Sequence, residues 1–232
     1  MKKTMKKRDL KVIARIETDF PTKFGIPRQS GLIPELRGRI IFELEYRNPE
    51  ALRGIEGYSH LWLLWEFSEV SIDNWSPTVR PPRLGGNKRM GVFATRSPYR
   101  PNPIGLSSVK LEKITEDTKL GTVLEISGAD LMNGTPIYDI KPYIAYTDSH
   151  PEALGGFSTD VFENTLAVEF PSALKTQLSE IQVNALLKIL ESDPRPAYKA
   201  DGDRIYSFEF GDFNIKFSVN RNILTVLSVE KI

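Results

Sequence analysis

An alternating pattern runs through Arg39-Ile40-Ile41-Phe42-Glu43-Leu44-Glu45-Tyr46. Ile40, Phe42 and Leu44 would lie on one face of an extended chain, and Ile41, Glu43 and Glu45 on the other. A period of two residues is that of a β-strand, because successive side chains point to opposite faces. The pattern therefore predicts a strand over Arg39–Tyr46.

The rest of the first 145 residues has the same character. Further strands are predicted at Leu10–Glu17, Tyr58–Phe67, Ser107–Ile114 and Gly121–Ser127. One short helix is predicted over Glu50–Ile55, with Asn48 as its cap, Pro49 at its first position and Gly54 or Gly57 at its end. Many short strands with a single short helix favour an antiparallel sandwich or barrel over alternating βαβ units. We predict a mainly β protein with an antiparallel β-barrel.

A second unit is predicted after Tyr146, where polar and breaker-rich residues follow. Pro171–Glu191 has apolar residues at near-helical spacing and predicts an amphipathic helix of about five turns. Strands are expected at Arg204–Phe210, Asn214–Val219 and Ile223–Val229, the last two joined by a hairpin at 220–222. The expected organisation is a flexible basic N-terminus (1–10), a barrel (11–146), a linker (147–170) and a small α+β domain (171–232).

Composition excludes several classes of protein. The 232 residues include 40% hydrophobic and 26% charged residues, which are ordinary globular values. There is no cysteine, which excludes disulfides, thiolate metal sites and thiol nucleophiles, and the two histidines argue against a nitrogen-ligated metal. The longest apolar run, Leu61–Trp65, is far shorter than the ~20 residues of a membrane span. We expect a cytoplasmic protein without a metal or a membrane segment.

A basic stretch is the first candidate for function. Between Arg80 and Lys110 there are seven basic residues and no acidic one, together with five prolines and four glycines. Prolines and glycines disfavour a helix, so a shaped loop around a short strand at Gly91–Thr95 is expected. Uncompensated cations suit an anionic partner such as phosphate, and a solvated basic loop is the alternative. The basic N-terminus, Met1–Lys11, is interpreted as a frayed terminus or as an arm that contacts nucleic acid.

Common enzymatic signatures are missing. The chain has no GxxxxGK[ST], GxSxG or HExxH motif, and its glycine cluster at 85–91 does not match a dinucleotide fingerprint. Three polar, turn-rich segments adjoin apolar stretches and are either turns or parts of a site: Pro27–Gly31, Asp130–Pro136 and Asp193–Tyr198. His60 precedes the apolar Leu61–Trp65 and is interpreted as a hydrogen-bonded core histidine rather than a base.

Long stretches resemble one family. The run Pro81–Leu106 is similar to the TsaA-like β-barrel family of tRNA adenine-N6-methyltransferases, as are Pro27-Arg28-Gln29, Gly57–Trp62 and Asp130–Tyr143. Asp193–Tyr198 with Asp212-Phe213-Asn214 resembles the second domain of its bacterial two-domain branch. The resemblance implies S-adenosylmethionine-dependent methylation of N6 of threonylcarbamoyl-adenosine (t6A) at position 37 of tRNA. It also implies a homodimer that binds the tRNA anticodon stem-loop, with the cofactor on the barrel near the subunit contact.

The resemblance also implies site residues. Those expected to bind the cofactor are Pro27, Arg28, Gln29, Ser68, Glu69, Arg96, Leu106, Asn133, Gly134, Thr135 and Pro136. An arginine, Arg28 or Arg96, suits the cofactor carboxylate, and backbone groups of the 133–136 turn suit the adenine edge. Those expected to bind RNA are Arg83, Lys88, Arg89, Arg100 and Arg195.

The chemistry requires alignment of nitrogen, methyl and sulfur, and a group that accepts the N6 proton. Asp139 or a backbone carbonyl of the 130–136 turn is the candidate acceptor, although Asp139 also suits a pair with Lys141. Tyr198, with Arg195, is expected to close the site from the second domain, and Tyr99 or Trp65 to stack on a splayed base. The alternative functions are a non-catalytic RNA-binding barrel and a methyltransferase of a small anionic metabolite.

Overall fold

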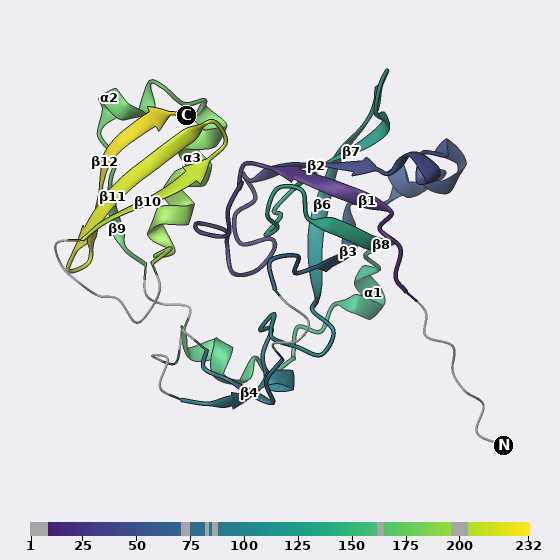
Figure 1. The fold of residues 1–232 in the computed structure, drawn as a ribbon, viewed down its shortest axis with the longest axis horizontal. Coiled ribbons are helices and arrows are strands. Elements are labelled where there is room, and N and C mark those ends of the chain that lie inside the picture. Colours follow the sequence, from purple (N-terminus) through teal and green to yellow (C-terminus); the bar gives the residue numbers. More distant parts are fainter. Residues whose placement is uncertain (1–8, 71–74, 82–83, 85–87, 162–164, 196–203) are drawn as a thin grey trace.

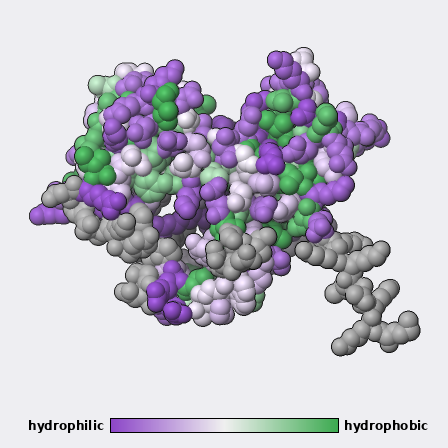
Figure 2. Space-filling view, in the orientation of Figure 1, coloured by the Kyte–Doolittle hydropathy of each residue, from purple (hydrophilic) through white to green (hydrophobic). Residues whose placement is uncertain are grey.

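Two units joined by a connecting segment make up the computed structural model, which describes residues 9–70, 75–81, 84, 88–161, 165–195 and 204–232 (Figure 1). One unit contains the first strands of the chain and the other carries the C-terminus. The segment that contains β4 (Thr78–Val79) lies beneath both units in this view. The hydropathy of this face is mixed, with hydrophilic side chains widespread and hydrophobic ones in scattered groups (Figure 2).

The first unit is a closed antiparallel barrel with the strand order β1-β2-β7-β6-β3-β8. Its strands are β1 (Ala14–Thr18), β2 (Arg37–Phe42), β3 (His60–Glu66), β6 (Ile104–Asp117), β7 (Gly121–Ser127) and β8 (Pro136–Pro142). The barrel closes through a short pairing of β1 with β8, at Ala14 and Arg15. Side chains that alternate along these strands, such as Ile40, Leu63 and Ile126, fill its interior. The mainly β class and the barrel are confirmed.

Several elements are shorter than the pattern predicts. β1 begins at Ala14, which pairs with Phe42, and one further backbone hydrogen bond, from the Glu43 amide to the Ile13 carbonyl at 2.9 Å, follows this pair. The prediction of strand over residues 44–46 is wrong, because Leu44–Tyr46 forms the 3-10 turn η1 with Leu44 exposed. The predicted strand at Gly91–Thr95 is likewise reduced to β5 (Met90–Gly91), paired with β4, followed by the 3-10 turn η6 (Val92–Ala94).

The predicted short helix is a pair of 3-10 turns, η2 (Pro49–Leu52) and η3 (Ile55–Gly57). The Asn48 side chain accepts a hydrogen bond from the Glu50 amide, as expected for a cap. Strand β8 was not among the predicted strands, because its sequence begins and ends with proline and follows a turn signal at Asn133-Gly134. After it comes the short helix α1 (Ala145–Asp148).

The C-terminal unit is a four-stranded sheet with a helix, in the order β10-β11-β12-β9. Its strands are β10 (Ile205–Phe210), β11 (Phe213–Asn220), β12 (Ile223–Lys231) and β9 (Ala167–Glu169), which is parallel to β12 and lies inside the stretch predicted as a linker. The 3-10 turn η7 (Gly156–Val161) precedes it. The hairpin at 220–222 is confirmed, since Asn220 pairs with Ile223.

The predicted five-turn helix is wrong. Two helices replace it, α2 (Ser172–Lys175) and α3 (Glu180–Glu191). Ser179 begins α3 with a capping box, in which its hydroxyl accepts from the Gln182 amide and the Gln182 side chain accepts from the Ser179 amide. This cap favours a new start at Ser179 over a continuous helix.

A loop of the first unit is part of the C-terminal core. Phe20, Ile33 and Leu36, from the connection between β1 and β2, are buried among α3 and the C-terminal sheet. Gly25, with φ +92°, lets the chain approach so closely that an added Cβ would lie 2.6 Å from the Phe208 ring. The Gly211 amide donates to the Asp19 carbonyl at 2.7 Å. The loop that leads to Pro27-Arg28-Gln29 is therefore held by both units.

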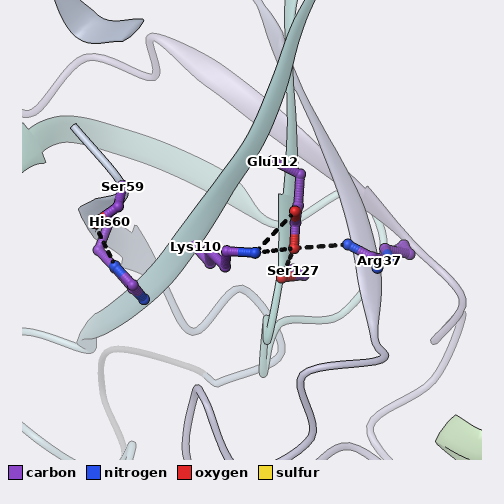
Figure 3. A network of polar contacts seen from close by, with 6 residues as sticks. All are labelled: Arg37, Ser59, His60, Lys110, Glu112 and Ser127. Carbon is purple, nitrogen blue, oxygen red and sulfur yellow. Dashed lines mark hydrogen bonds and ion pairs between the residues drawn. The ribbon is translucent and has the colours of Figure 1, made fainter. Parts of the chain in front are cut away.

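The outer face of the barrel carries a cluster of polar side chains centred on Glu112 (Figure 3). Its carboxylate pairs with Arg37 at 2.8 Å and Lys110 at 3.1 Å, and accepts the Ser127 hydroxyl at 2.7 Å. These bonds lower the pKa of Glu112 to about 2. The cluster joins β2, β6 and β7. Beside it, the His60 Nδ1 and the Ser59 hydroxyl are 2.9 Å apart, so the histidine is hydrogen-bonded as predicted, but it is only partly buried and is not a core residue.

Candidate functional site

A cavity of about 560 Å³ opens at one end of the barrel. Four separate parts of the chain line it: the β1–β2 loop between residues 23 and 29, the end of β3 with residues 67–70, the loop and strand start between residues 95 and 106, and Asp130, Met132 and Thr135 after β7. Cavities of this size commonly hold a small ligand or cofactor. The lining includes cations, carboxylates and apolar groups together.

Most of the residues predicted to bind a cofactor meet in this cavity. Those on its wall are Pro27, Arg28, Gln29, Ser68, Glu69, Arg96, Leu106 and Thr135. Three others, Asn133, Gly134 and Pro136, belong to the adjoining turn and are not part of the lining. Sequence positions more than 100 residues apart thus converge because β7, β6 and β3 are consecutive in the barrel, and β8 pairs with both β3 and β1.

Trp65 forms the inner wall and is 7% exposed. It lies opposite Gly105 in the β3–β6 pairing, where an added Cβ would come within 2.2–2.5 Å of the indole. Only glycine at this position leaves room for the indole. The Phe67 ring packs against the indole, with ring centroids 4.3 Å apart and ring planes tilted by 58°.

A hydrogen-bonded chain runs from this tryptophan to a carboxylate. The Trp65 Nε1 donates to the Ser107 Oγ at 2.9 Å, and the Ser107 hydroxyl donates to the Asp130 Oδ1 at 2.5 Å. Ser107 is fully buried. Burial raises the pKa of Asp130, and the bond from Ser107 opposes that effect. Asp130 belongs to a candidate segment of the sequence but was given no role there. The signal that could have singled it out is an acidic residue between two apolar ones, Ala129 and Leu131.

Two arginines of the basic loop have different partners. Arg96 donates to the side-chain oxygen of Gln29 and so joins two predicted cofactor-binding residues. Arg100 donates to the carbonyls of Val92 at 3.2 Å and Thr95 at 2.7 Å, and its guanidinium lies 5.6 Å from the Phe93 ring centroid. These bonds hold the loop in shape, so Arg100 has a structural task besides lining the cavity.

In the turn that links β7 to β8, three backbone amides donate hydrogen bonds to backbone carbonyls of the protein itself. The amide of Asn133 donates to Phe20, that of Gly134 to Ile16, and that of Thr135 to Met132. The Asn133 side chain accepts the Thr18 amide at 3.1 Å. The expectation that this turn's amides read an adenine edge does not fit these bonds, because the three donors are already engaged.

Asp139 lies outside the cavity lining. Its carboxylate pairs with Lys141 at 2.9 Å and accepts the Ile140 amide at 3.0 Å. The structure thus shows the alternative stated above for Asp139, an ion pair with Lys141. Tyr198, the other predicted catalytic residue, lies outside the described residues.

A second and larger cavity of about 1370 Å³ adjoins the first. The two share Arg28, Gln29, Thr95, Arg96, Pro98 and Tyr99. Its other wall comes from β4, from Arg80 and Arg89, and from residues 154–158 of the connecting segment. Among the described residues that line it there are four arginines and no acidic side chain. Phe93, 73% exposed, and Leu154, 97% exposed, add apolar surface.

The residues predicted to bind RNA are not all in this groove. Arg89 lines it and donates to the Thr78 hydroxyl at 3.2 Å. Lys88 is exposed next to it but is not part of the lining, and Arg83 lies outside the described residues. Arg195 makes two bonds to Asp193, at 2.8 and 2.9 Å, with a side chain only 14% exposed. Arg80 belongs to the basic stretch noted in the sequence but was not among the residues expected to bind RNA, and Phe93 and Leu154 were given no role; the three line one cavity although they come from distant parts of the chain.

The described residues were compared with the features of metal-binding and membrane-spanning proteins. They contain no group of three or more His, Cys, Asp or Glu side chains arranged to hold a metal ion. Within the same residues, no helix has both the length and the apolar character needed to cross a membrane.

Comparisons with known proteins agree with this architecture. Residues 15–149 match the profile of the tRNA-methyltransferase O N-terminal domain, and residues 163–232 match that of the TrmO C-terminal domain. A crystal structure of TrmO from Pseudomonas aeruginosa superposes with a TM-score of 0.75 at 32% identity, covering 97% of this chain and 99% of that one.

Two relatives cover nearly the whole chain. The tRNA (adenine(37)-N6)-methyltransferase of Escherichia coli K12 is 38% identical over 226 residues, 94% of this chain and 96% of the relative. A Pseudomonas aeruginosa relative, also 38% identical over 94% of this chain and 95% of its own length, carries the name "Putative S-adenosylmethionine-dependent methyltransferase RcsF". Profile, sequence and structure agree over both units, and the chain belongs to the tRNA-methyltransferase O (TrmO) family.

Proposed function

We propose that this protein uses S-adenosylmethionine to methylate N6 of t6A at position 37 of tRNA. The observation that carries the proposal is the pair of adjoining cavities. The smaller one is lined by charged groups of both signs, and the charged side chains that line the larger one, among the residues that the structure describes, are all arginines. Their common wall, which includes Arg96 and Tyr99, is where a donor in one and an acceptor in the other would meet.

The residues of the smaller cavity fit the cofactor. Arg28 and Arg96 suit its carboxylate, and Glu66 and Glu69 suit its positive charges. Apolar groups such as Trp65 and Leu106 offer surfaces for the rest of the molecule. When bound, S-adenosylmethionine supplies an activated methyl group. The protein has to hold that group and the acceptor nitrogen in line, which in favourable cases contributes roughly 7–11 kcal/mol.

The larger cavity fits single-stranded RNA. Arg28, Arg80, Arg89 and Arg96 line it and suit backbone phosphates. Phe93 and Tyr99 are exposed aromatic rings on which a splayed base can stack. The threonyl carboxylate of t6A is one more anion, and Arg96 or Arg89, which line the larger cavity, suits it better than Arg100, which is not part of that lining and whose Nη1 donates to two backbone carbonyls. This pairing would make the prior modification a condition for productive binding.

The experiment compares two tRNAs that differ only in the threonylcarbamoyl group. The purified protein is incubated with S-adenosylmethionine and each tRNA, and the nucleosides are analysed by mass spectrometry. We expect t6A to gain the mass of one methyl group and unmodified adenosine at position 37 to gain none. Equal methylation of both would refute the t6A requirement.

The same assay separates the alternatives. A non-catalytic RNA-binding barrel would bind tRNA, transfer no methyl group and gain no thermal stability from S-adenosylmethionine, whereas a thousandfold excess over Kd should stabilise a cofactor-binding protein by about 4 kcal/mol. A methyltransferase of a small anionic metabolite would be stabilised by the cofactor but leave tRNA unchanged. Homodimerisation and a cytoplasmic location remain predictions, the first to be measured by light scattering on the purified protein.

A further inference from the structure

Of the described carboxylates that line the smaller cavity, Asp130 is the one held by a chain of hydrogen bonds that starts at a buried tryptophan. Glu66 accepts the Tyr138 hydroxyl at 2.5 Å, and Glu69 is exposed on the loop after β3. Asp130 instead accepts a hydrogen bond from the Ser107 hydroxyl, and the Ser107 oxygen in turn accepts one from the Trp65 indole. A backbone hydrogen bond from Ser30 adds a second fixed contact.

We propose that Asp130 is the proton acceptor for the nitrogen that is methylated, with Ser107 and Trp65 as positioning residues. This inference rests on the proposed function. Asp130 lines the smaller cavity together with Arg96, and Arg96 also belongs to the wall common to the two cavities. Asp139, the acceptor considered from sequence, pairs with Lys141 and is not part of either lining.

The proton and electrons balance in one displacement. The nitrogen forms a bond to the methyl carbon while the carbon–sulfur bond breaks and its electron pair stays on sulfur. The N6–H bond breaks, its electron pair stays on nitrogen, and the proton moves to the Asp130 carboxylate. The positive charge that sulfur loses is therefore carried away by this proton, which Asp130 later releases to water.

The surroundings of Asp130 suit a base at neutral pH. Burial raises its pKa above that of an ordinary aspartate, which makes the carboxylate a stronger proton acceptor. Hydrogen bonds from Ser107 and Ser30 and the charge of Arg96 act in the opposite direction. The other charged groups on the cavity wall are Lys23, Arg28, Glu66, Glu69 and Arg100.

The first test needs no cofactor. The chain has three tryptophans, so the Nε1–H signal of Trp65 can be assigned in a ¹H–¹⁵N spectrum by a single substitution. We expect this signal to move with pH as Asp130 titrates, because Ser107 joins the two groups. Asp130→Asn should abolish the transition, and Ser107→Ala should both weaken it and raise its midpoint. A transition that persists in Asp130→Asn would refute the relay.

The second test measures catalysis on t6A-containing tRNA. Asp130→Asn keeps the shape of the side chain and should lower kcat about 100-fold while the Kd for cofactor, from calorimetry, stays within about threefold. The acid limb of the wild-type kcat/KM profile should disappear in Asp130→Asn and persist in Asp139→Asn. A weakened cofactor Kd with kcat restored at saturation would mean that Asp130 anchors the cofactor, which overturns the inference.

The two proposals fail in different ways. A wild-type protein that transfers no methyl group to t6A refutes the proposed function and this inference with it. An active wild type with an equally active Asp130→Asn variant refutes the inference alone.

Discussion

Gly105→Ala should destabilise the barrel more than any ordinary surface glycine substitution. An added Cβ would lie 2.2–2.5 Å from three atoms of the Trp65 indole, far inside van der Waals contact. The indole has little room to retreat, because it is 7% exposed and the Phe67 ring packs against it. Overpacking of this kind costs about 1–3 kcal/mol, and losing the Trp65–Ser107 hydrogen bond adds about 1 kcal/mol.

The expected loss is therefore roughly 2–4 kcal/mol of the free energy of unfolding. For a chain of this length that lowers the thermal midpoint by roughly 5–15 °C. Tryptophan fluorescence is the suitable probe, since the tryptophans are residues 62, 65 and 75, all in the first half of the chain. Gly57→Ala is the matched control, because a Cβ there meets nothing within 4 Å.

A double-mutant cycle identifies the cause. Trp65→Phe removes the part of the ring that an alanine at 105 would touch, so the two substitutions together should cost less than the sum of each alone. Strict additivity, or a Gly105→Ala midpoint equal to that of Gly57→Ala, would refute the argument that glycine is needed to admit the indole.

Three further predictions concern binding and pH. Arg96→Ala should weaken cofactor binding about 10–100-fold in calorimetry with the fold intact, whereas Arg53→Ala, which removes a cation paired with Glu50, should not. Binding of tRNA should fall steeply with salt, and Arg80→Ala or Arg89→Ala should each reduce the log–log slope by about one; a flat salt dependence would contradict phosphate contacts. The pKa of Glu112 is lowered to about 2. The contribution of this carboxylate to the free energy of unfolding should therefore be complete above its unfolded pKa of about 4.5 and be lost as the pH falls towards 2. Because this carboxylate is 27% exposed, we expect Glu112→Gln to cost about 1–2 kcal/mol at pH 7 in urea unfolding, and to flatten the acid dependence.

The fold class could be predicted because the alternation of apolar and polar residues along a strand can be seen within one short stretch of sequence. Ile40 and Phe42 are buried and Ile41 is partly exposed, as the alternation at Arg39–Tyr46 indicates. The ends of the strands could not be predicted in the same way, since β2 stops at Phe42 where its partner β1 begins. The break between α2 and α3 was present in the sequence as Ser179-x-x-Gln182, a capping box that the apolar spacing obscured.

The candidate site was predictable only where a motif could be compared with a family. Nothing in the spacing of Pro27-Arg28-Gln29, Ser68-Glu69 and Arg96 indicates that these segments meet; the barrel order brings them together. Arg195 shows a limit of such a comparison, because the resemblance implied that it binds RNA, whereas its Nε and Nη2 donate to the two oxygens of the Asp193 carboxylate. Charge is visible in a sequence, but the partner that neutralises it is visible only in three dimensions.

The register of β3 against β6 links the stability of the barrel to the geometry of the site. Gly105 and Ser107 are buried and alternate with Leu106, which is 54% exposed on the cavity wall. The same pairing sets Trp65 opposite Gly105 and so places its indole next to Ser107 and Asp130. A slip of one residue would exchange Ser107 for a neighbour on the other face and break the chain of hydrogen bonds. Substitutions that loosen this pair of strands should therefore disturb the Asp130 carboxylate even when they lie far from the bound ligand.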